Sequence, residues 1–257
     1  KHRWGTEVKI VLSICFVTSV AFSDGSEALF LEGNESYAKG KYEDAIQSYE
    51  SILALGFESG DLYYNLGNAY YKQHSLGQAI WAYRNALKLK PRDPDAQYNL
   101  ELANVRRVDR IEIPTSFFLL EEYRTLKKIL TLQEWILCGS IFLTIQAILV
   151  FFMQFGWISG QFHQKLLTVI IVVILGVHGI AVDKYFQEKQ THEGVIIANG
   201  VDVYSGPYTT DNTVLFGINE GSIAEIQVHK IEGNWVEIIL IDGKKGWVPV
   251  ESIRGLK

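Results

Sequence analysis

Hydrophobic and polar positions follow three different patterns along this 257-residue chain. Nearly unbroken apolar tracts cover residues 10–22, 135–158 and 166–182. Between the first two tracts apolar residues recur at helical spacing, whereas after residue 193 short apolar and polar stretches alternate between glycine, asparagine and proline. Helical spacing predicts packed helices, the two longer tracts predict membrane spans, and alternation predicts strands. The predicted fold class is multidomain, with an all-α array, two transmembrane helices and an all-β carboxyl-terminal barrel.

Residue types in the helical part recur at a spacing of 34. The pairs are Gly33-Asn34 and Gly67-Asn68, Ala45-Ile46 and Ala79-Ile80, Tyr49 and Tyr83, with a further partial copy at Tyr98-Asn99-Leu100. This period resembles the tetratricopeptide family, in which helix pairs stack because one pair cannot bury its own apolar face. The second repeat carries the eight signature positions of the family: Tyr63, Leu66, Gly67, Tyr70, Ala79, Tyr83, Ala86 and Pro91. The resemblance implies an array that binds other proteins.

The repeats are expected over residues 26–59 and 60–93, followed by a capping helix over 94–109. Gly67 and Ala79 are small because the two helices of a hairpin cross closely there, and Pro91 stops the second helix. The third unit stops after one helix, which is typical of a cap that closes the stack with its polar face.

In this family the first helix of each hairpin lines a concave groove. The resemblance places the following residues in it: Asn34, Tyr37, Tyr64, Asn65, Asn68, Tyr71, Lys72, Tyr98, Asn99 and Arg106. Tyrosine offers amphipathic contact area and asparagine can bind an extended peptide backbone. The alternative is that the same residues are simply what the repeat needs to fold. A carboxylate clamp is not expected, because Asp61 and Asp95 stand where a lysine is needed.

The first apolar tract predicts an export signal over residues 1–23. Ile10–Phe22 follows a basic start and ends in small residues that suit cleavage after Ala21 or Ser23, which favours export over an uncleaved anchor. The two cysteines are Cys15, which would leave with the signal, and Cys138, which lies in the second tract. The exported domains are therefore expected to have no disulfide, thiolate metal site or cysteine nucleophile.

The second and third tracts predict transmembrane helices over 135–158 and 166–182, with Trp135 and Trp157 at interface depth. A short connection over 159–165 makes them an antiparallel hairpin, so the flanking domains face the same side. With the signal in front, that side is outside the cytoplasmic membrane. The charges of the connecting loop do not support this orientation, but the export signal is given more weight than the loop charges. The alternative is a buried helical hairpin in a soluble protein.

Two further features belong to the predicted membrane region. Residues 117–132 mix apolar and charged positions and predict a helix at the membrane interface. His178 is the one titratable side chain in the middle of a span, and Gln146 lies at similar depth when both are counted from a loop centre near Phe162. We expect Gln146 and His178 to hydrogen-bond across the hairpin, where neighbouring glycines permit close approach.

The carboxyl-terminal region over 194–254 resembles the bacterial SH3-like family. The resemblance rests on Gly206-Pro207 after the first strand, on Asn234-Trp235 and on Gly246-Trp247-Val248. It implies a small barrel with a ligand face formed by Tyr204, Trp235 and Trp247. Large aromatic residues in a domain this small are more often core, so at least one of the tryptophans is expected to be buried there.

No catalytic constellation accompanies these modules. The net charge of −5 is too mild to indicate a nucleic-acid partner. The sequence has no Gly-x-Ser-x-Gly turn or His-Glu-x-x-His helix, and its six histidines lack metal-ligand spacing. We therefore expect a non-enzymatic protein without cofactor or metal. A wall peptidase or membrane hydrolase is the enzyme alternative.

The order of signal, repeats, two-span hairpin and SH3-like domain resembles the BatE family of the Bat (Bacteroides aerotolerance) envelope proteins. That resemblance implies a scaffold in the cytoplasmic (inner) membrane with both domains facing the periplasm. Its implied partners are proteins with von Willebrand type A domains and, directly or indirectly, a MoxR-type ATPase, in envelope stress tolerance. The alternative is an adaptor that binds peptidoglycan and recruits wall enzymes.

Overall fold

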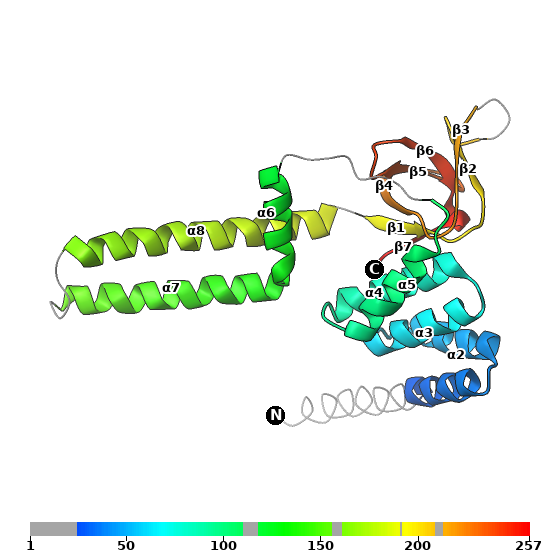
Figure 1. The fold of residues 1–257 in the computed structure, drawn as a ribbon, viewed down its shortest axis with the longest axis horizontal. Coiled ribbons are helices and arrows are strands. Elements are labelled where there is room, and N and C mark those ends of the chain that lie inside the picture. The colour runs from blue at the N-terminus through cyan, green and yellow to red at the C-terminus, as the bar shows by residue number, and fades with distance from the viewer. Residues whose placement is uncertain (1–24, 110–117, 156–160, 191, 209–212) are drawn as a thin grey trace, which may run out of the picture. The chain divides into compact units, whose positions relative to one another are not determined.

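The structure is a computed structural model that describes residues 25–109, 118–155, 161–190, 192–208 and 213–257 (Figure 1). The predicted signal peptide, Cys15 and Trp157 lie outside the described residues. The chain divides into two compact units. The repeat helices and Glu193–Lys257 form the first unit, and Ile113–His192 form the second.

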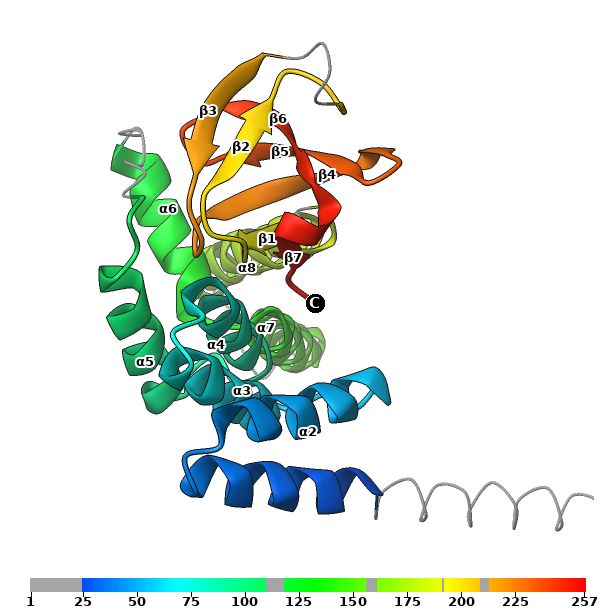
Figure 2. The same cartoon turned by 90° about the vertical axis from the view of Figure 1, so that its right-hand side faces the viewer.

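The repeat array consists of antiparallel helix hairpins. Its helices cover residues 25–38, α2 Tyr42–Ala54, α3 Gly60–Lys72, α4 Leu76–Leu89 and α5 Pro94–Val105. Consecutive helices lie against one another in chain order, as Figure 2 shows. The predicted helical array is confirmed, and its third unit consists of α5 alone within the described residues.

Local sequence explains where these helices start and why they pack so closely. The Ser59 hydroxyl caps α3 by accepting from the Leu62 N–H, and Asp93 caps α5 in the same way. A Cβ built on Gly67 would lie 2.6 Å from Cε1 of Tyr83, so the tyrosine ring requires a glycine opposite it. The same relation holds one repeat earlier, where Tyr49 lies against Gly33.

In its described residues the second unit contains three helices: α6 Phe118–Ile129, α7 Leu132–Gln154 and α8 Gln161–Gln190. α7 begins with a capping box formed by Thr131 and Glu134. α7 and α8 each contain a window of mean hydropathy 2.4, so both are long and apolar enough to cross a membrane. α8 continues eight residues beyond the predicted span, because Asp183 and the residues after it favour a helix as readily as a linker.

Residues 192–208 and 213–257 form one antiparallel sheet of seven strands in the order β3-β2-β6-β5-β4-β1-β7. The strands are β1 Glu193–Ile196, β2 Val201–Tyr204, β3 Val214–Ile218, β4 Ile223–Glu232, β5 Trp235–Leu240, β6 Lys245–Pro249 and β7 Ile253–Gly255. The core of the sheet includes Val203, Ile238 and Val248. Val195 of β1 belongs instead to the core of the repeat helices, and the partly buried Leu256 packs against that core. The sheet and the repeats therefore share apolar packing.

Candidate functional site

Asparagine side chains on the first helix of each hairpin join that hairpin to the next one. The Asn34 side-chain oxygen accepts hydrogen bonds from the Tyr49 hydroxyl at 2.7 Å and from Asn65 Nδ2 at 2.9 Å. Burial raises the pKa of Tyr49 to about 12, so its hydroxyl remains a donor across the physiological range. One amide oxygen therefore holds three helices together.

The same unit occurs 34 residues later. The Asn68 side-chain oxygen accepts from the Tyr83 hydroxyl at 2.8 Å and from Asn99 Nδ2 at 2.8 Å. Burial raises the pKa of Tyr83 as well. The oxygens of Asn34 and Asn68 are thus engaged within the array, which supports the interpretation that these asparagines stabilise the repeats.

The other predicted groove residues lie on or directly after the same helices, and we call the surface that carries Tyr71, Tyr98 and Arg106 the inner face. Arg106 places its guanidinium carbon 4.6 Å from the ring centre of Tyr71. The buried Tyr71 hydroxyl has no hydrogen-bond partner within the described ranges. Tyr98 is 67% exposed, and Lys72 is exposed as well. The structure therefore brings Tyr71 and Arg106 together and leaves Tyr98 open to a ligand.

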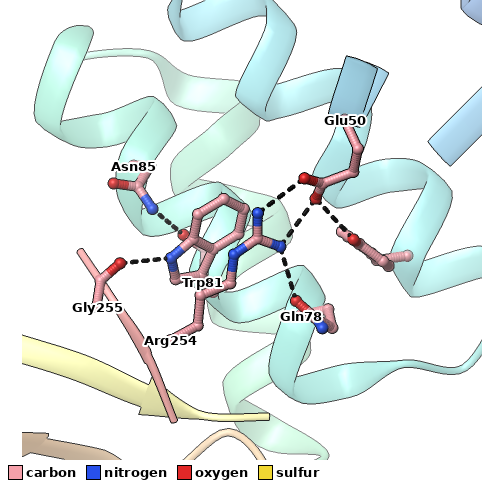
Figure 3. A network of polar contacts seen from close by, with 7 residues as sticks. Glu50, Gln78, Trp81, Asn85, Arg254 and Gly255 are labelled. Atoms are coloured by element: carbon pink, nitrogen blue, oxygen red, sulfur yellow. Dashed lines mark hydrogen bonds and ion pairs between the residues drawn. The ribbon is translucent and has the colours of Figure 1, made fainter. Parts of the chain in front are cut away.

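Side chains of α2 and α4 form a second surface, which we call the outer face and which sequence reasoning missed. Figure 3 shows the Arg254 guanidinium lying flat on the Trp81 indole, 3.4 Å from the ring centre. Its two terminal nitrogens each donate to one carboxylate oxygen of Glu50 at 2.8 Å, and one of them also donates to Gln78 at 3.1 Å. Burial alone would lower the pKa of Arg254, but hydrogen bonds and the charge of Glu50 outweigh it and raise the pKa. The arginine therefore stays charged.

Main-chain atoms of the last described residues also bind α4. The Trp81 indole nitrogen donates to the Gly255 carbonyl oxygen at 2.8 Å. The buried Asn85 side chain accepts from the Lys257 N–H at 2.9 Å, and Lys88 donates to the main-chain oxygen of Lys257 at 2.6 Å. Residues 254–257 thus run along α4 as a bound segment.

Further contacts fasten the sheet to the repeats near both ends of the inserted second unit. On the side that leads into it, the Asp109 carboxylate accepts from the main chain and side chain of Asn219 and from the Ser222 hydroxyl. On the side that returns from it, Glu193 pairs with Arg84 of α4. The first unit therefore holds the chain at Asp109 and at Glu193.

One residue of the sequence could have indicated the interface between the repeats and the sheet, namely a tryptophan outside the repeat signature. Trp81 is none of the eight signature residues, yet it is only 1% exposed. A large aromatic side chain at a surface position of a repeat predicts that something covers it. The partner was not predictable, because Gly255 is 174 residues away.

The three aromatic residues predicted for the sheet lie together. Tyr204 meets Trp235 edge to face with ring centres 5.4 Å apart, and it pairs directly with Trp247 across β2 and β6. All three are partly buried and none belongs to the core cluster of the sheet. The expectation that one of the tryptophans is core is therefore wrong, because both project on the side opposite Val236 and Val248.

The predicted hydrogen bond between Gln146 and His178 is replaced by another arrangement. His178 packs on Gly139, where an added Cβ would lie 2.5 Å from the imidazole, and its Nδ1 pairs with the Ile174 carbonyl oxygen at 2.9 Å. Gln146 lies seven residues further along α7, about 10 Å away. The two helices are aligned differently from the expectation because α7 ends at Gln154 and α8 begins at Gln161. The midpoint between these two ends comes before Phe162, the loop centre assumed from the sequence.

Across the described residues no group of three His, Cys, Asp or Glu side chains could hold a metal ion. Cys138 is a free thiol inside α7. The first unit offers hydrogen-bonding groups, aromatic faces and charged side chains for recognition.

Comparison with known protein families identifies the repeat to which these helices belong. Residues 33–74 match the family described as TPR repeat, and residues 64–107 match the family described as tetratricopeptide repeat. No curated protein matches the chain. The chain therefore contains tetratricopeptide repeats, which form a protein-interaction module, next to two helices of membrane-spanning length and a carboxyl-terminal sheet.

Proposed function

We propose that the protein is a non-enzymatic, membrane-anchored scaffold that presents the repeats and the sheet on one side of the membrane. The observation that carries this proposal is the single compact unit formed by the repeats and Glu193–Lys257. Two domains that pack together cannot lie on opposite sides of a bilayer. An inserted hairpin with two spans returns the chain to its starting side and so satisfies this condition.

Membrane anchoring rests on α7 and α8. The 23 residues of α7 extend about 35 Å, compared with a hydrocarbon core of about 30 Å. Apolar side chains such as Ile141, Leu143 and Val172 are strongly exposed within the second unit. Lipid is the environment that suits such a surface.

α6 is proposed to rest at the membrane interface. Phe118, Leu119 and Ile129 are exposed, and no residue of α6 is buried. Lys127 in its last turn pairs with Asp183 of α8, whereas the neighbouring Lys128 is a long basic side chain of the kind that can reach lipid headgroups.

The cytoplasmic (inner) membrane and the periplasmic side are proposed from the signal expected over residues 1–23 and from the order of the modules. That order also supports a Bat-type envelope complex with von Willebrand type A-domain proteins and a MoxR-type ATPase. The inner face, with Tyr71, Tyr98 and Arg106, is the proposed contact surface for such a partner. We propose in addition that the sheet is an SH3-like domain.

A second candidate function is a peptidoglycan-binding adaptor. The observation that favours it is the aromatic group of Tyr204, Trp235 and Trp247 outside the core of the sheet, because aromatic faces of this kind bind sugars and peptides. Sedimentation of the detergent-solubilised chain with purified sacculi tests it. W235A and W247A variants should lose co-sedimentation if the adaptor function is correct.

Affinity purification of the tagged chain from its native membrane, with mass spectrometry of what is recovered, tests the scaffold. We expect proteins with von Willebrand type A domains to be recovered with the parent chain. An R106A variant should recover them less well, and a K39A variant on an exposed helix end should match the parent. Recovery of wall enzymes alone would favour the adaptor instead.

A further inference from the structure

Residues 253–257 meet the repeats in the manner of a bound peptide. β7 is a strand of three residues at one edge of the sheet, and it pairs only with β1 among the described strands. The segment that continues from it gives its main chain to α4, because the Gly255 oxygen and the Lys257 nitrogen bind Trp81 and Asn85. Main-chain recognition at every second residue is typical of extended peptides bound to a domain.

Three side chains of the segment also contact the repeats: Lys257 pairs with Glu58, Leu256 packs against their core, and Arg254 enters a slot that fits a guanidinium group. Trp81 forms a flat floor at 3.4 Å, and Glu50 presents both carboxylate oxygens edge-on. The Tyr70 hydroxyl donates to the same Glu50 carboxylate at 2.8 Å and so holds its orientation. Figure 3 shows the floor on α4 and the carboxylate on α2, so both come from the repeats.

This geometry distinguishes arginine from lysine. A guanidinium group is planar and carries five donors in a fixed fork, so it can stack on an indole and bind two carboxylate oxygens at once. An ammonium group offers a point charge, which would reach one oxygen of Glu50 and leave the indole face without a planar partner.

We propose that the slot formed by Trp81, Glu50 and Gln78 is an arginine-recognition site for extended peptide segments, and that residues 254–257 of the chain fill it in cis. An arginine-bearing segment added in trans takes the same place when Arg254 is absent. The site lies on the outer face of the repeats, so it is separate from the proposed partner surface at Tyr71, Tyr98 and Arg106. Within the segment 254–257, Arg254 is the side chain that fills this slot.

The test uses the full chain in detergent and a labelled synthetic peptide with the sequence of residues 251–257. The R254A chain should bind this peptide roughly tenfold or more tightly than a version with lysine at the arginine position, as loss of one charge-assisted contact predicts. The parent chain should bind it weakly, because its own segment occupies the slot. Fluorescence anisotropy measures all three affinities.

Two outcomes would overturn the proposal. One is equal binding of the arginine and lysine peptides to R254A, and the other is binding that survives an added Glu50→Gln substitution. If the R254A chain fails to fold, R254K serves in its place, since it keeps the positive charge. The arginine peptide should then bind R254K more tightly than the parent chain, and failure to do so contradicts the site. Neither result depends on membrane insertion or on capture of an envelope partner.

Discussion

Tyr83 takes part in two features of the repeat that the sequence period links. Its ring lies against Gly67, and its hydroxyl donates to Asn68, which also binds Asn99 of the next unit. Tyr49 does the same with Gly33 and Asn34 one repeat earlier. A glycine, an asparagine and a tyrosine thus act as one packing unit.

Removing the hydroxyl of Tyr83 tests the hydrogen-bonded part of that unit. A Tyr83→Phe substitution should lower the free energy of unfolding by about 1 kcal/mol, because it deletes one buried donor while the ring stays in place. Thermal unfolding followed by circular dichroism measures the loss. Tyr98→Phe is the matched control, since Tyr98 is 67% exposed and should change little. Equal effects at the two positions would contradict this role.

Adding one methyl group at Gly67 tests the packing part. The new Cβ would lie 2.6 Å from the Tyr83 ring, so Gly67→Ala should cost about 1–3 kcal/mol through overpacking. Gly25→Ala places its Cβ in open space and provides the comparison. A Gly67→Ala protein that unfolds at the same temperature as Gly25→Ala would show that the ring can move aside freely.

Among the elements, the segment after α5 is fixed to the sheet by the Asp109 carboxylate. Burial alone would raise the pKa of Asp109, but hydrogen bonds from Asn219 and Ser222 outweigh it and lower the pKa. A lowered folded-state pKa means that these bonds stabilise the fold fully above about pH 4, the ordinary value of the group, and weaken as pH falls through the lowered value.

An Asp109→Asn variant should therefore be less stable than the parent chain at pH 7. The difference in melting temperature between the two should shrink progressively below about pH 4, where the parent carboxyl takes up its proton. A difference that stays constant from neutral to acid pH would mean that the charge of Asp109 contributes nothing to the docking of the sheet.

The register of the α7–α8 hairpin gives a second element-scale prediction. Because His178 packs on Gly139, Gly139→Ala should lower the free energy of unfolding of the detergent-solubilised protein by about 1–3 kcal/mol, which thermal unfolding would detect. Gln146→Leu should be nearly neutral, whereas it would be destabilising if Gln146 and His178 formed the hydrogen bond expected from the sequence. If Gln146→Leu destabilised the protein more than Gly139→Ala, the result would contradict this packing and favour the pairing expected from the sequence.

These elements also show how far sequence reasoning reaches. The helix pairs were predictable because Gly67 and Tyr83 are 16 residues apart within one repeated pattern. The hairpin register was not, because it depends on where two apolar helices end, and apolar composition does not mark an end. The pairing of Arg254 with Trp81 depends on a docking geometry that no local pattern encodes.

On the scale of the whole molecule, the sheet completes the repeat unit. Val195 enters the apolar core of the repeats, Leu256 packs against that core, and Arg254 covers Trp81. Such an interface is expected to make the repeats and the sheet unfold together, although Ile113–His192 separates them in sequence.

The most direct test of the account asks whether the repeats and the sheet lie on the same side of a membrane. Single cysteines would be introduced at Gln47 in α2, Asp202 in β2 and Ser159 between the apolar tracts, in a chain whose Cys15 and Cys138 are replaced by serine. A membrane-impermeant maleimide would then be added to intact cells with a permeable outer envelope. We predict labelling at positions 47 and 202 and protection at 159 until the membrane is disrupted. Labelling of only one of positions 47 and 202, or a protein that is not retained in the membrane, would contradict a single recognition unit anchored by a hairpin.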